Sequence, residues 1–418
     1  MDNSYTPSRR TFLMGAGSLA VVGATAAACG GGSGGSNNLS QWYHQYGEKG
    51  TEQAAKKYAA SYKKKKVTVQ WKPGDYGTAL SAALLGRNTP DVFESQFSIQ
   101  LATSKQAVPL DDILASVKSD FNEIDIATNS YKGKTYGVRM ISDPQLLYYR
   151  KSLFQNAGIQ VPTTIEELIN ATAALSKGNV KGLYLGKDQG VGALGLVSIH
   201  AAGAAQLNAD NTAPGFTGDD AIEAYTQVQA LSKSKGLLHD YSTDWADPGA
   251  FINEQCAMQW CGMWAMPQIQ AKFKDDFGVM PFPKIGSAGK PVVYTGGWTS
   301  FVAAKSKHID DAKAFLKWLW IDNTADQEDW CLSYGFHIPP RKSLAAKATK
   351  LQSGAAAETV KLNGQYGVSD NPYWTPTLVT PYTDMMTNII RKGNDPKGAV
   401  AKAAPLVQTA LNRLLSGK

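Results

Sequence analysis

The chain has 418 residues, of which 43% are hydrophobic and 18% are charged, and its formal net charge is +7. These values are typical of a soluble globular protein, and the length favours two lobes over a single core. The positive charge is mild, and its only dense run, Lys63 to Lys66, follows a predicted helix, where lysines form a solvated surface and favour the helix C-terminus. We therefore expect no nucleic-acid partner.

Residues 8–29, SRRTFLMGAGSLAVVGATAAAC, combine an arginine pair, a short apolar run and small residues before Cys29. The run is too short and too weakly apolar for a spanning helix, and this order is typical of an export signal. SRRTFL resembles the twin-arginine export motif, and AAAC resembles a bacterial lipobox, although Ala26 stands where leucine is usual. We predict an export signal over residues 1–28, and a lipidated Cys29 with a flexible Gly/Ser/Asn tether over residues 29–38. A plain cleaved signal is the alternative.

Strands and helices alternate after the tether. The sequence predicts a strand in LSQWYHQY, a helix in GTEQAAKKYAASY, a strand in VTVQW, a helix in YGTALSAALLGRN and a strand in TPDVFES. This order predicts an α/β lobe with a largely parallel sheet, and ligands of such sheets bind beyond the carboxyl ends of the strands. The loops at those ends hold residues 44–48, 72–76 and 94–96.

Later segments predict a second lobe and two connections to it. KTYGVRMISDPQLLYYRKSLF is typical of a crossing strand pair, and PTTIEELINATAALSKG of a helix that begins with a capping box of Thr163 and Glu166. FGVMPFPKIGSAGKPVVYTGGWTSFVAA favours a return crossover. GVGALG, residues 190–195, lacks the context of a phosphate loop and is expected to be a flexible loop.

The cysteines do not indicate a metal site. Cys256, Cys261 and Cys331 show no CxxC or Cys/His spacing, so we predict no metal and no cofactor. On a strand, Cys256 and Cys261 would point to opposite faces, which argues against a bridge between them. Buried thiols are expected, and a pair with Cys331 remains open.

An ordered set of segments resembles a known family. In chain order they are VTVQW…TPDVF, YGVRMISDPQLLYYRKSLFQNAGIQVPTTIEEL, CAMQWCGMWAM, FGVMPFPKIG, GGWTSFVAAKSKHIDDAKAFLKWL and GFHIPPRKS. Together they resemble the extracellular solute-binding lipoproteins of carbohydrate ABC importers, the maltose-binding-protein-like group, over residues 39–418. The resemblance implies a two-lobed periplasmic-binding-protein-like α/β fold (type II), with mixed sheets flanked by helices and a hinged cleft.

The resemblance also implies an organisation and partners. The N-terminal lobe would comprise residues 39–142 and 286–338, and the C-terminal lobe residues 143–285 and 339–418. A monomer, lipid-anchored to the outer face of the cell membrane, would bind a carbohydrate in the cleft, close around it and deliver it to an ABC permease without any catalysis.

Three tryptophans are candidates for stacking on a sugar ring, whose C–H face packs on aromatic side chains. Trp264, in CGMW, matches the family's Gly-x-Trp position, which implies a stacking role. Trp298 follows Gly296 and Gly297, which leave room for a ligand, and Trp374 lies in the irregular stretch DNPYWTP. The alternative for each is packing in the core.

Polar candidates would bind the sugar hydroxyls. The resemblance places Asp143 in a crossover that faces the cleft. It also implies sugar-binding groups in two loops, which hold Glu94 and Gln96 after the third strand, and His44 and Tyr46 after the first. The run ESQ departs from the aromatic and acidic run of the maltose binder. Two further candidates have open alternatives, because Asp75 could instead cap a helix and Arg341 could instead pair with an acid.

The predicted function is capture of a di- or oligosaccharide. Within the binding-protein class, a peptide or polyamine remains an alternative. A glycoside hydrolase would need two carboxylates about 5 to 10 Å apart, which the sequence does not specify, and no GxSxG or HExxH motif is present. A lipoprotein adhesin without a small ligand is the remaining alternative.

Overall fold

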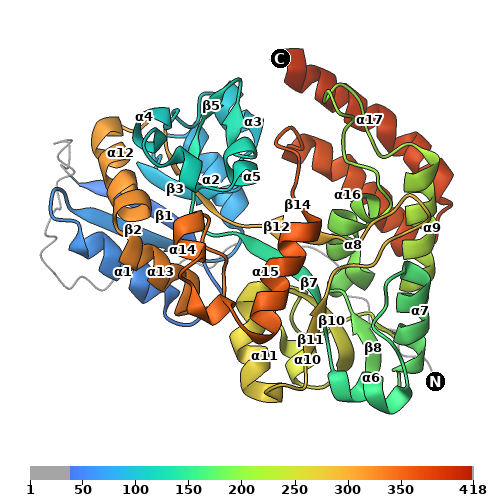
Figure 1. The fold of residues 1–418 in the computed structure, drawn as a ribbon. Coiled ribbons are helices and arrows are strands. Elements are labelled where there is room, and N and C mark those ends of the chain that lie inside the picture. Colours follow the sequence, from blue (N-terminus) through green and yellow to red (C-terminus); the bar gives the residue numbers. More distant parts are fainter. Residues whose placement is uncertain (1–37, 417–418) are drawn as a thin grey trace, which may run out of the picture. The chain divides into compact units, whose positions relative to one another are not determined.

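The computed structural model describes residues 38–416 (Figure 1). The predicted export signal, the lipidation site Cys29 and the tether up to residue 37 lie outside the described residues. Within residues 38–416, none of the helices is both long and apolar enough to cross a membrane.

The first sheet forms as the alternation of strands and helices predicts. Its strands lie in the order β2-β1-β3-β13-β6, with the bounds β1 (Leu39–His44), β2 (Val67–Lys72), β3 (Val92–Ser95), β6 (Gly137–Arg139) and β13 (Thr299–Val302). β1 is parallel to both β2 and β3, whereas β13 is antiparallel to β3 and β6. The predicted parallel β-α-β-α-β unit is confirmed, and its sheet is completed by strands from much later in the chain.

Short and medium helices surround this sheet (Figure 1). They are α1 (Thr51–Ser61), α2 (Tyr76–Leu85), α3 (Ile99–Thr103), α4 (Asp111–Leu114), α5 (Glu123–Ala127), α12 (Ile309–Lys317), α13 (Thr324–Leu332) and α14 (Lys342–Ala345), with the hairpin β4 (Ser130–Tyr131) and β5 (Lys134–Thr135). α12 buries Ala312, Phe315 and Leu316, which lie three and four residues apart and so share one face of the helix.

The second sheet is mixed. Its order is β14-β12-β7-β10-β8-β9, with β11 paired to β7. The bounds are β7 (Asp143–Tyr149), β8 (Lys181–Tyr184), β9 (Leu237–Leu238), β10 (Cys256–Gly262), β11 (Gly278–Met280), β12 (Val293–Gly296) and β14 (Gly367–Val368). The helices of this lobe are α6 (Lys151–Ala157), α7 (Ile165–Ala174), α8 (Lys187–Ala201), α9 (Asp219–Ser232), α10 (Gly249–Ile252), α11 (Met266–Phe273), α15 (Gly354–Tyr366), α16 (Pro376–Ile390) and α17 (Pro396–Ser416).

Two segments, residues 140–142 and 296–298, cross between the sheets, and the segment around Ile338 lies beside them. The assignment of residues from 339 onward to the second lobe does not hold at α14, because Ser343 still donates hydrogen bonds to Asp120 of the first lobe. The backbone N–H of Met140 donates to the carbonyl of Trp298 over 2.8 Å, and Ser142 and Ile338 exchange two backbone hydrogen bonds of 2.9 and 3.0 Å. Gly297 adopts a φ of 132°, and a Cβ at this position would lie 2.2 Å from the carbonyl oxygen of Ile141. Only glycine allows these two crossing segments to approach so closely.

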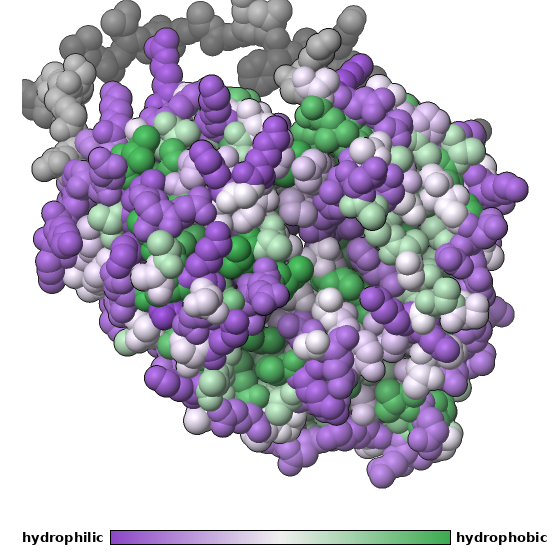
Figure 2. All heavy atoms as spheres, turned by 45° about the horizontal axis from the view of Figure 1, so that its top comes forward, coloured by the Kyte–Doolittle hydropathy of each residue, from purple (hydrophilic) through white to green (hydrophobic). Residues whose placement is uncertain are grey.

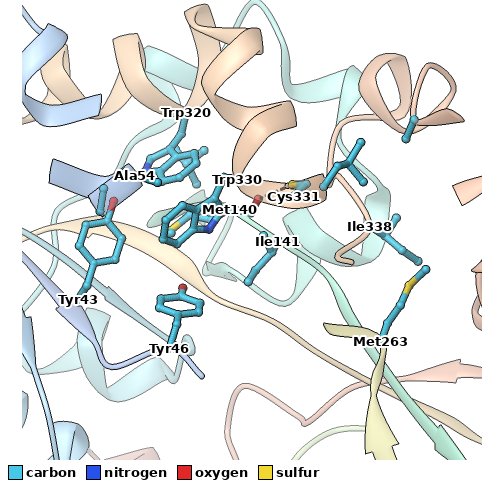
Figure 3. Close-up of a cluster of buried hydrophobic side chains, with 14 of the residues drawn as sticks. Tyr43, Tyr46, Ala54, Met140, Ile141, Met263, Trp320, Trp330, Cys331 and Ile338 are labelled. Atoms are coloured by element: carbon cyan, nitrogen blue, oxygen red, sulfur yellow. Dashed lines mark hydrogen bonds between the residues drawn. The ribbon is translucent and has the colours of Figure 1, made fainter. Parts of the chain in front are cut away.

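A buried cluster joins the first sheet to the crossing segments. Figure 3 shows Tyr43 and Tyr46, which belong to the first strand and the loop after it, beside Trp330 of α13 and Met140 and Ile141 of the first crossing. The ring centroids of Tyr46 and Trp330 are 5.1 Å apart and the rings meet edge to face. At the surface, Figure 2 shows a face on which hydrophilic residues predominate and hydrophobic ones form small separate groups.

Three further details differ from the sequence prediction. β12 pairs with β7 in the second sheet, although residues 286–338 were assigned to the first lobe, so the chain enters the first sheet again only at β13. The capping box of α7 uses Thr164 and Glu167, one residue later than predicted. Residues 190–195 are not a flexible loop but lie within α8, after a left-handed turn at residues 188–190.

Candidate functional site

A cavity of about 1090 Å³ lies between elements of the two sheets. From the first sheet it is lined at the carboxyl ends of the strands. The lining residues there are His44, the last residue of β1, the start of α2 after β2, and Gln96 after β3. Residues 294–298, 369–371 and 374 line it from the other side. Of the predicted site residues, it brings together His44, Asp75, Gln96, Trp298 and Trp374.

His44 and Trp298 form a stacked pair in the cavity wall. Their ring centroids are 3.8 Å apart with an angle of 19° between the planes. His44 Nδ1 donates to Glu94 Oε1 over 2.5 Å, so the ring orientation is fixed, and its Nε2 has no hydrogen-bond partner among the described residues. The second ring nitrogen is thus left for a ligand.

Glu94 lies behind the cavity wall. Its side chain is buried and accepts hydrogen bonds from the backbone N–H of His44 (2.7 Å) and from the Tyr46 hydroxyl (2.7 Å) as well as from the imidazole. Burial, followed by the negative charge of Glu94, holds the pKa of Tyr46 well above its usual value. Glu94 and Tyr46 therefore position His44 and do not themselves line the cavity.

Asp75 combines its two predicted roles. It is the N-cap of α2, because its carboxylate accepts hydrogen bonds from the backbone N–H of Thr78 (3.1 Å) and from the Thr78 hydroxyl (2.7 Å). These bonds lower the pKa of Asp75. The same residue lines the cavity.

Trp374 contributes only an edge to the cavity. It is 9% exposed and packs edge to face against Phe216 and Tyr382, with centroid distances of 6.2 and 5.4 Å. The core-packing alternative therefore describes most of this ring. Next to it, Asp370 accepts hydrogen bonds of 2.6 Å from the Tyr294 hydroxyl and from Gln206 Nε2. Burial raises the pKa of Asp370.

Sequence reasoning missed Asp370, Arg139 and Asn129, all of which line the cavity. Arg139 Nε donates to Asp125 Oδ1 (3.0 Å), and Asn129 Nδ2 donates to the carbonyl of Asp125 (2.8 Å). The Oδ1 atom of Asn129 is buried and has no partner within residues 38–416. Two signals were available in the sequence: Arg139 ends an extended run before the first crossing, and Asp370 is the first residue of the irregular stretch DNPYWTP that holds Trp374.

Asp143 lies outside the cavity lining, in a buried ionic group between crossing segments. His337 Nδ1 lies 2.5 Å from Asp143 Oδ1, and His337 Nε2 lies 3.3 Å from Glu48 Oε1. Burial alone lowers the pKa of His337, but the two carboxylates reverse this effect and raise it to about 10. The imidazole is therefore a cation that joins Asp143 at the start of β7 to the loop after β1.

Trp264 and Arg341 also do not line the cavity. The Trp264 ring lies over Gly262, where a Cβ would be 1.9 Å from it, and its Nε1 donates to the carbonyl of Ala246 over 2.8 Å. Arg341 donates to Asp120 Oδ2 over 2.8 Å and to the carbonyl of Ile321 over 2.7 Å. The alternative interpretation of Arg341, pairing with an acid, describes its contacts, although Asp120 is not a cavity residue.

The cysteines of the described chain are free. Cys256, Cys261 and Cys331 are buried and unpaired, as expected, and burial raises the pKa of each thiol. Within residues 38–416 no group of three or more His, Cys, Asp or Glu side chains is placed to hold a metal ion.

Comparison with known proteins places this architecture in a family. Residues 38–319 match the model of the bacterial extracellular solute-binding proteins. The chain is 28% identical to the diacetylchitobiose binding protein DasA of Streptomyces coelicolor over 67% of its own length and 66% of that protein. It covers about half, 49% and 48%, of two further curated relatives.

Solved structures agree on the fold. The GacH receptor of Streptomyces glaucescens, described with acarbose, superposes with a TM-score of 0.74 at 27% identity, over 91% of this chain and 98% of that one. A solute-binding protein of Thermotoga lettingae bound to α-D-tagatose gives a TM-score of 0.77 at 21% identity, over 90% and 100% of the two chains. The two-lobed α/β fold predicted from the sequence is thus confirmed, and the chain belongs to the family of bacterial extracellular solute-binding proteins.

Proposed function

We propose that the protein captures a carbohydrate, a di- or oligosaccharide, in the cavity between the two sheets and delivers it to an ABC import permease. The observation that carries this proposal is the composition of the cavity wall, which combines aromatic rings with side chains that donate and accept hydrogen bonds. Sugars need both, because they present a C–H face and a rim of hydroxyl groups.

The size of the cavity supports a ligand of more than one sugar unit. Its volume of about 1090 Å³ lies at the upper end of the range for small-molecule sites. Two relatives point the same way, since one is described as binding diacetylchitobiose and another with acarbose. A polyamine, which is a polycation, would be favoured by a denser set of carboxylates than Asp75 and Asp370 provide.

We infer specific roles for the residues of the wall. Trp298 presents the ring face that is not covered by His44, and His44 Nε2, Gln96 and Asp370 bind hydroxyl groups. Asn129 Oδ1, which is buried without a partner, accepts from a ligand hydroxyl and so offsets the cost of its desolvation. Trp264 keeps the stacking role implied by the family resemblance as a prediction that needs its own test.

The finer placement of the protein is also part of this proposal. We infer export through the twin-arginine motif, acylation of Cys29 and attachment to the outer face of the cell membrane as a monomer. The lobes would be the discontinuous halves predicted from the sequence, with the boundary before β13 moved to residues 296–299 and the last boundary moved from residue 339 to the stretch between α14 and α15. No catalytic step is proposed, in keeping with a family whose members bind solutes.

A titration of intrinsic tryptophan fluorescence tests the proposal. The panel includes diacetylchitobiose, mannotriose, maltotriose and a tripeptide, and a saturable change with one sugar is expected. Measured by calorimetry, Trp298→Ala should weaken the affinity for that sugar about tenfold, because loss of a stacked ring costs about 1.4 kcal/mol of binding free energy. Trp318→Phe, directly after α12 and outside the cavity lining, is the matched control and should leave the affinity unchanged.

Two outcomes would contradict the proposal. A saturable response to the tripeptide alone would indicate a peptide-binding protein. Equal sugar affinity of the wild type and Trp298→Ala would show that the sugar does not bind in the cavity. If Trp264→Ala then abolished binding, the site would instead lie at the family's Gly-x-Trp position.

A further inference from the structure

The edge of the first sheet that lies opposite to His44, Gln96 and Trp298 is basic. β1, β2 and β3 begin at this edge and β13 ends there, because Leu39 pairs with Val67, and Val302 with Val92. The loops at this edge are therefore residues 63–66, 86–91 and 303–308. Their exposed basic side chains are Lys63, Lys64, Lys66, Arg87, Lys305 and Lys307, with the half-buried Lys65 among them. We call this set the basic edge.

Acidic side chains at the same edge only partly offset this charge. Asp311 is paired with Lys65, and Asp310 is exposed beside it. Asp91 is buried and accepts hydrogen bonds from the hydroxyls of Ser40 (2.9 Å) and Ser306 (2.5 Å). The remaining lysines and Arg87 form no ion pair within residues 38–416, so their charge is not neutralised there.

The chain enters the described structure at this edge. The N–H of Leu39 donates to the carbonyl of Lys66 over 2.9 Å, which fixes the start of β1 beside the lysine run. Cys29 precedes Leu39 by ten residues, a span of at most about 35 Å when fully extended. A membrane anchor at Cys29 would hold the basic edge within reach of the lipid headgroups.

An apolar side chain stands in the same place. Leu85 at the end of α2 is 68% exposed, the highest value among the exposed large hydrophobic side chains of residues 38–416, and its carbonyl accepts a hydrogen bond of 2.7 Å from Lys305 Nζ. Leu85 also lines the end of the cavity that extends along α2. Basic side chains around an exposed apolar residue are the composition of surfaces that bind anionic membranes, because the lysines reach the headgroups while the apolar group enters the interface.

We propose that the basic edge docks on the anionic lipid surface of the membrane to which the protein is attached. The part of the cavity wall that holds His44, Gln96 and Trp298 lies at the other ends of β1 to β3, about 20 Å away for a strand of six residues. A protein docked in this way holds these side chains away from the lipid, where dissolved sugar arrives. The inference uses the proposed location outside the membrane but not the identity of the solute, so failure of sugar binding would leave it unchanged.

Cosedimentation with vesicles tests this docking surface. Residues 38–418 form one compact unit, so the chain beginning at Gly30 is used, without the leader and Cys29. Vesicles of 70% phosphatidylcholine and 30% phosphatidylglycerol should bind it, and vesicles of pure phosphatidylcholine should not. Binding should disappear in 1 M NaCl, where the Debye length is about 3 Å.

A charge-matched pair of variants localises the effect. Lys63→Gln/Lys64→Gln/Lys66→Gln should weaken partition about a hundredfold, since each lysine contributes about a factor of five. Lys392→Gln/Lys397→Gln/Lys402→Gln removes the same charge from exposed positions on and before α17 and should change partition by less than threefold. Leu85→Ser should weaken it a few-fold.

The proposal is overturned by any of three results. They are no binding to the anionic vesicles, equal binding to the neutral ones, and equal losses in the two triple variants. The last result would mean that net charge, and not this edge, drives the association. Sugar titration of the Lys63/Lys64/Lys66 variant should match the wild type, which keeps docking and capture separate.

Discussion

At the scale of single residues, the chemistry of the site depends on partners that are remote in the sequence. His337 contacts Asp143, 194 positions away, and Arg341 contacts Asp120, 221 positions away. The sequence singled out Asp143 and Arg341 as candidate cleft residues but did not determine their partners. Whether each side chain lines the cleft or forms an ion pair depends on which remote segments pack beside it, and the local sequence does not specify this packing.

The ion group of His337 makes stability depend on pH. Because its pKa in the folded protein is about 10, above the ordinary 6.5 of an unfolded chain, the contribution is fully present below pH 6.5. It is lost as the pH rises to about 10. The free energy of unfolding, measured by urea denaturation at intervals from pH 6 to pH 10, should therefore fall over this range.

A substitution isolates this contribution. His337→Gln leaves two buried carboxylates without their cation and should lower the free energy of unfolding at pH 6 by about 3–5 kcal/mol. It should also flatten the pH dependence between pH 7 and pH 10. His239→Gln, at an exposed position, is the control and should do neither. An unchanged slope in the His337 variant would show that another group titrates.

At the scale of secondary structure elements, sequence patterns performed well where the signal is local. The first five elements and the helix in PTTIEELINATAALSKG, which is α7, agree with prediction. The capping box was misplaced by one residue because TTIEE contains the Thr-x-x-Glu spacing twice. The second register is selected since Thr163 also donates to Glu167, through both its N–H (2.7 Å) and its hydroxyl (2.8 Å).

Packing of α7 on the second sheet depends on two glycines. A Cβ at Gly182 of β8 would lie 1.9 Å from the carbonyl oxygen of Thr172, and one at Gly236 would lie 2.1 Å from the same atom. Since the neighbour is backbone, it cannot rotate away. Gly182→Ala should therefore lower the free energy of unfolding by about 3 kcal/mol, measured by urea denaturation.

The matched control should have the opposite sign. Gly364 lies in α15, and nothing would lie within 4 Å of a Cβ there. Gly364→Ala should raise the free energy of unfolding by about 0.5–1 kcal/mol, because alanine has the better helix propensity. A Gly182→Ala protein as stable as the wild type would mean that α7 can move off the sheet without cost.

At the scale of the whole molecule, the crossing segments predict a rotation of the lobes around the ligand. The contacts between residues 140–142, 297–298 and 338 are mostly backbone hydrogen bonds, and they can persist while the sheets rotate. The sugar that saturates the fluorescence signal should lower the radius of gyration in small-angle X-ray scattering. Trp298→Ala at the same sugar concentration should remain at the ligand-free value, and an unchanged radius in the saturated wild type would argue for a rigid cavity.

The strand order of the first sheet has a consequence for folding during synthesis. β13 lies between β3 and β6, so β6 has no partner in its sheet until residues 299–302 exist. On the ribosome, the first sheet cannot be completed until most of the chain has been synthesised, and until then β3 has an unpaired edge. Pairing of strands so far apart in the sequence is slow. The interval between synthesis of β3 and β13 is therefore the period in which the nascent chain most needs protection from aggregation.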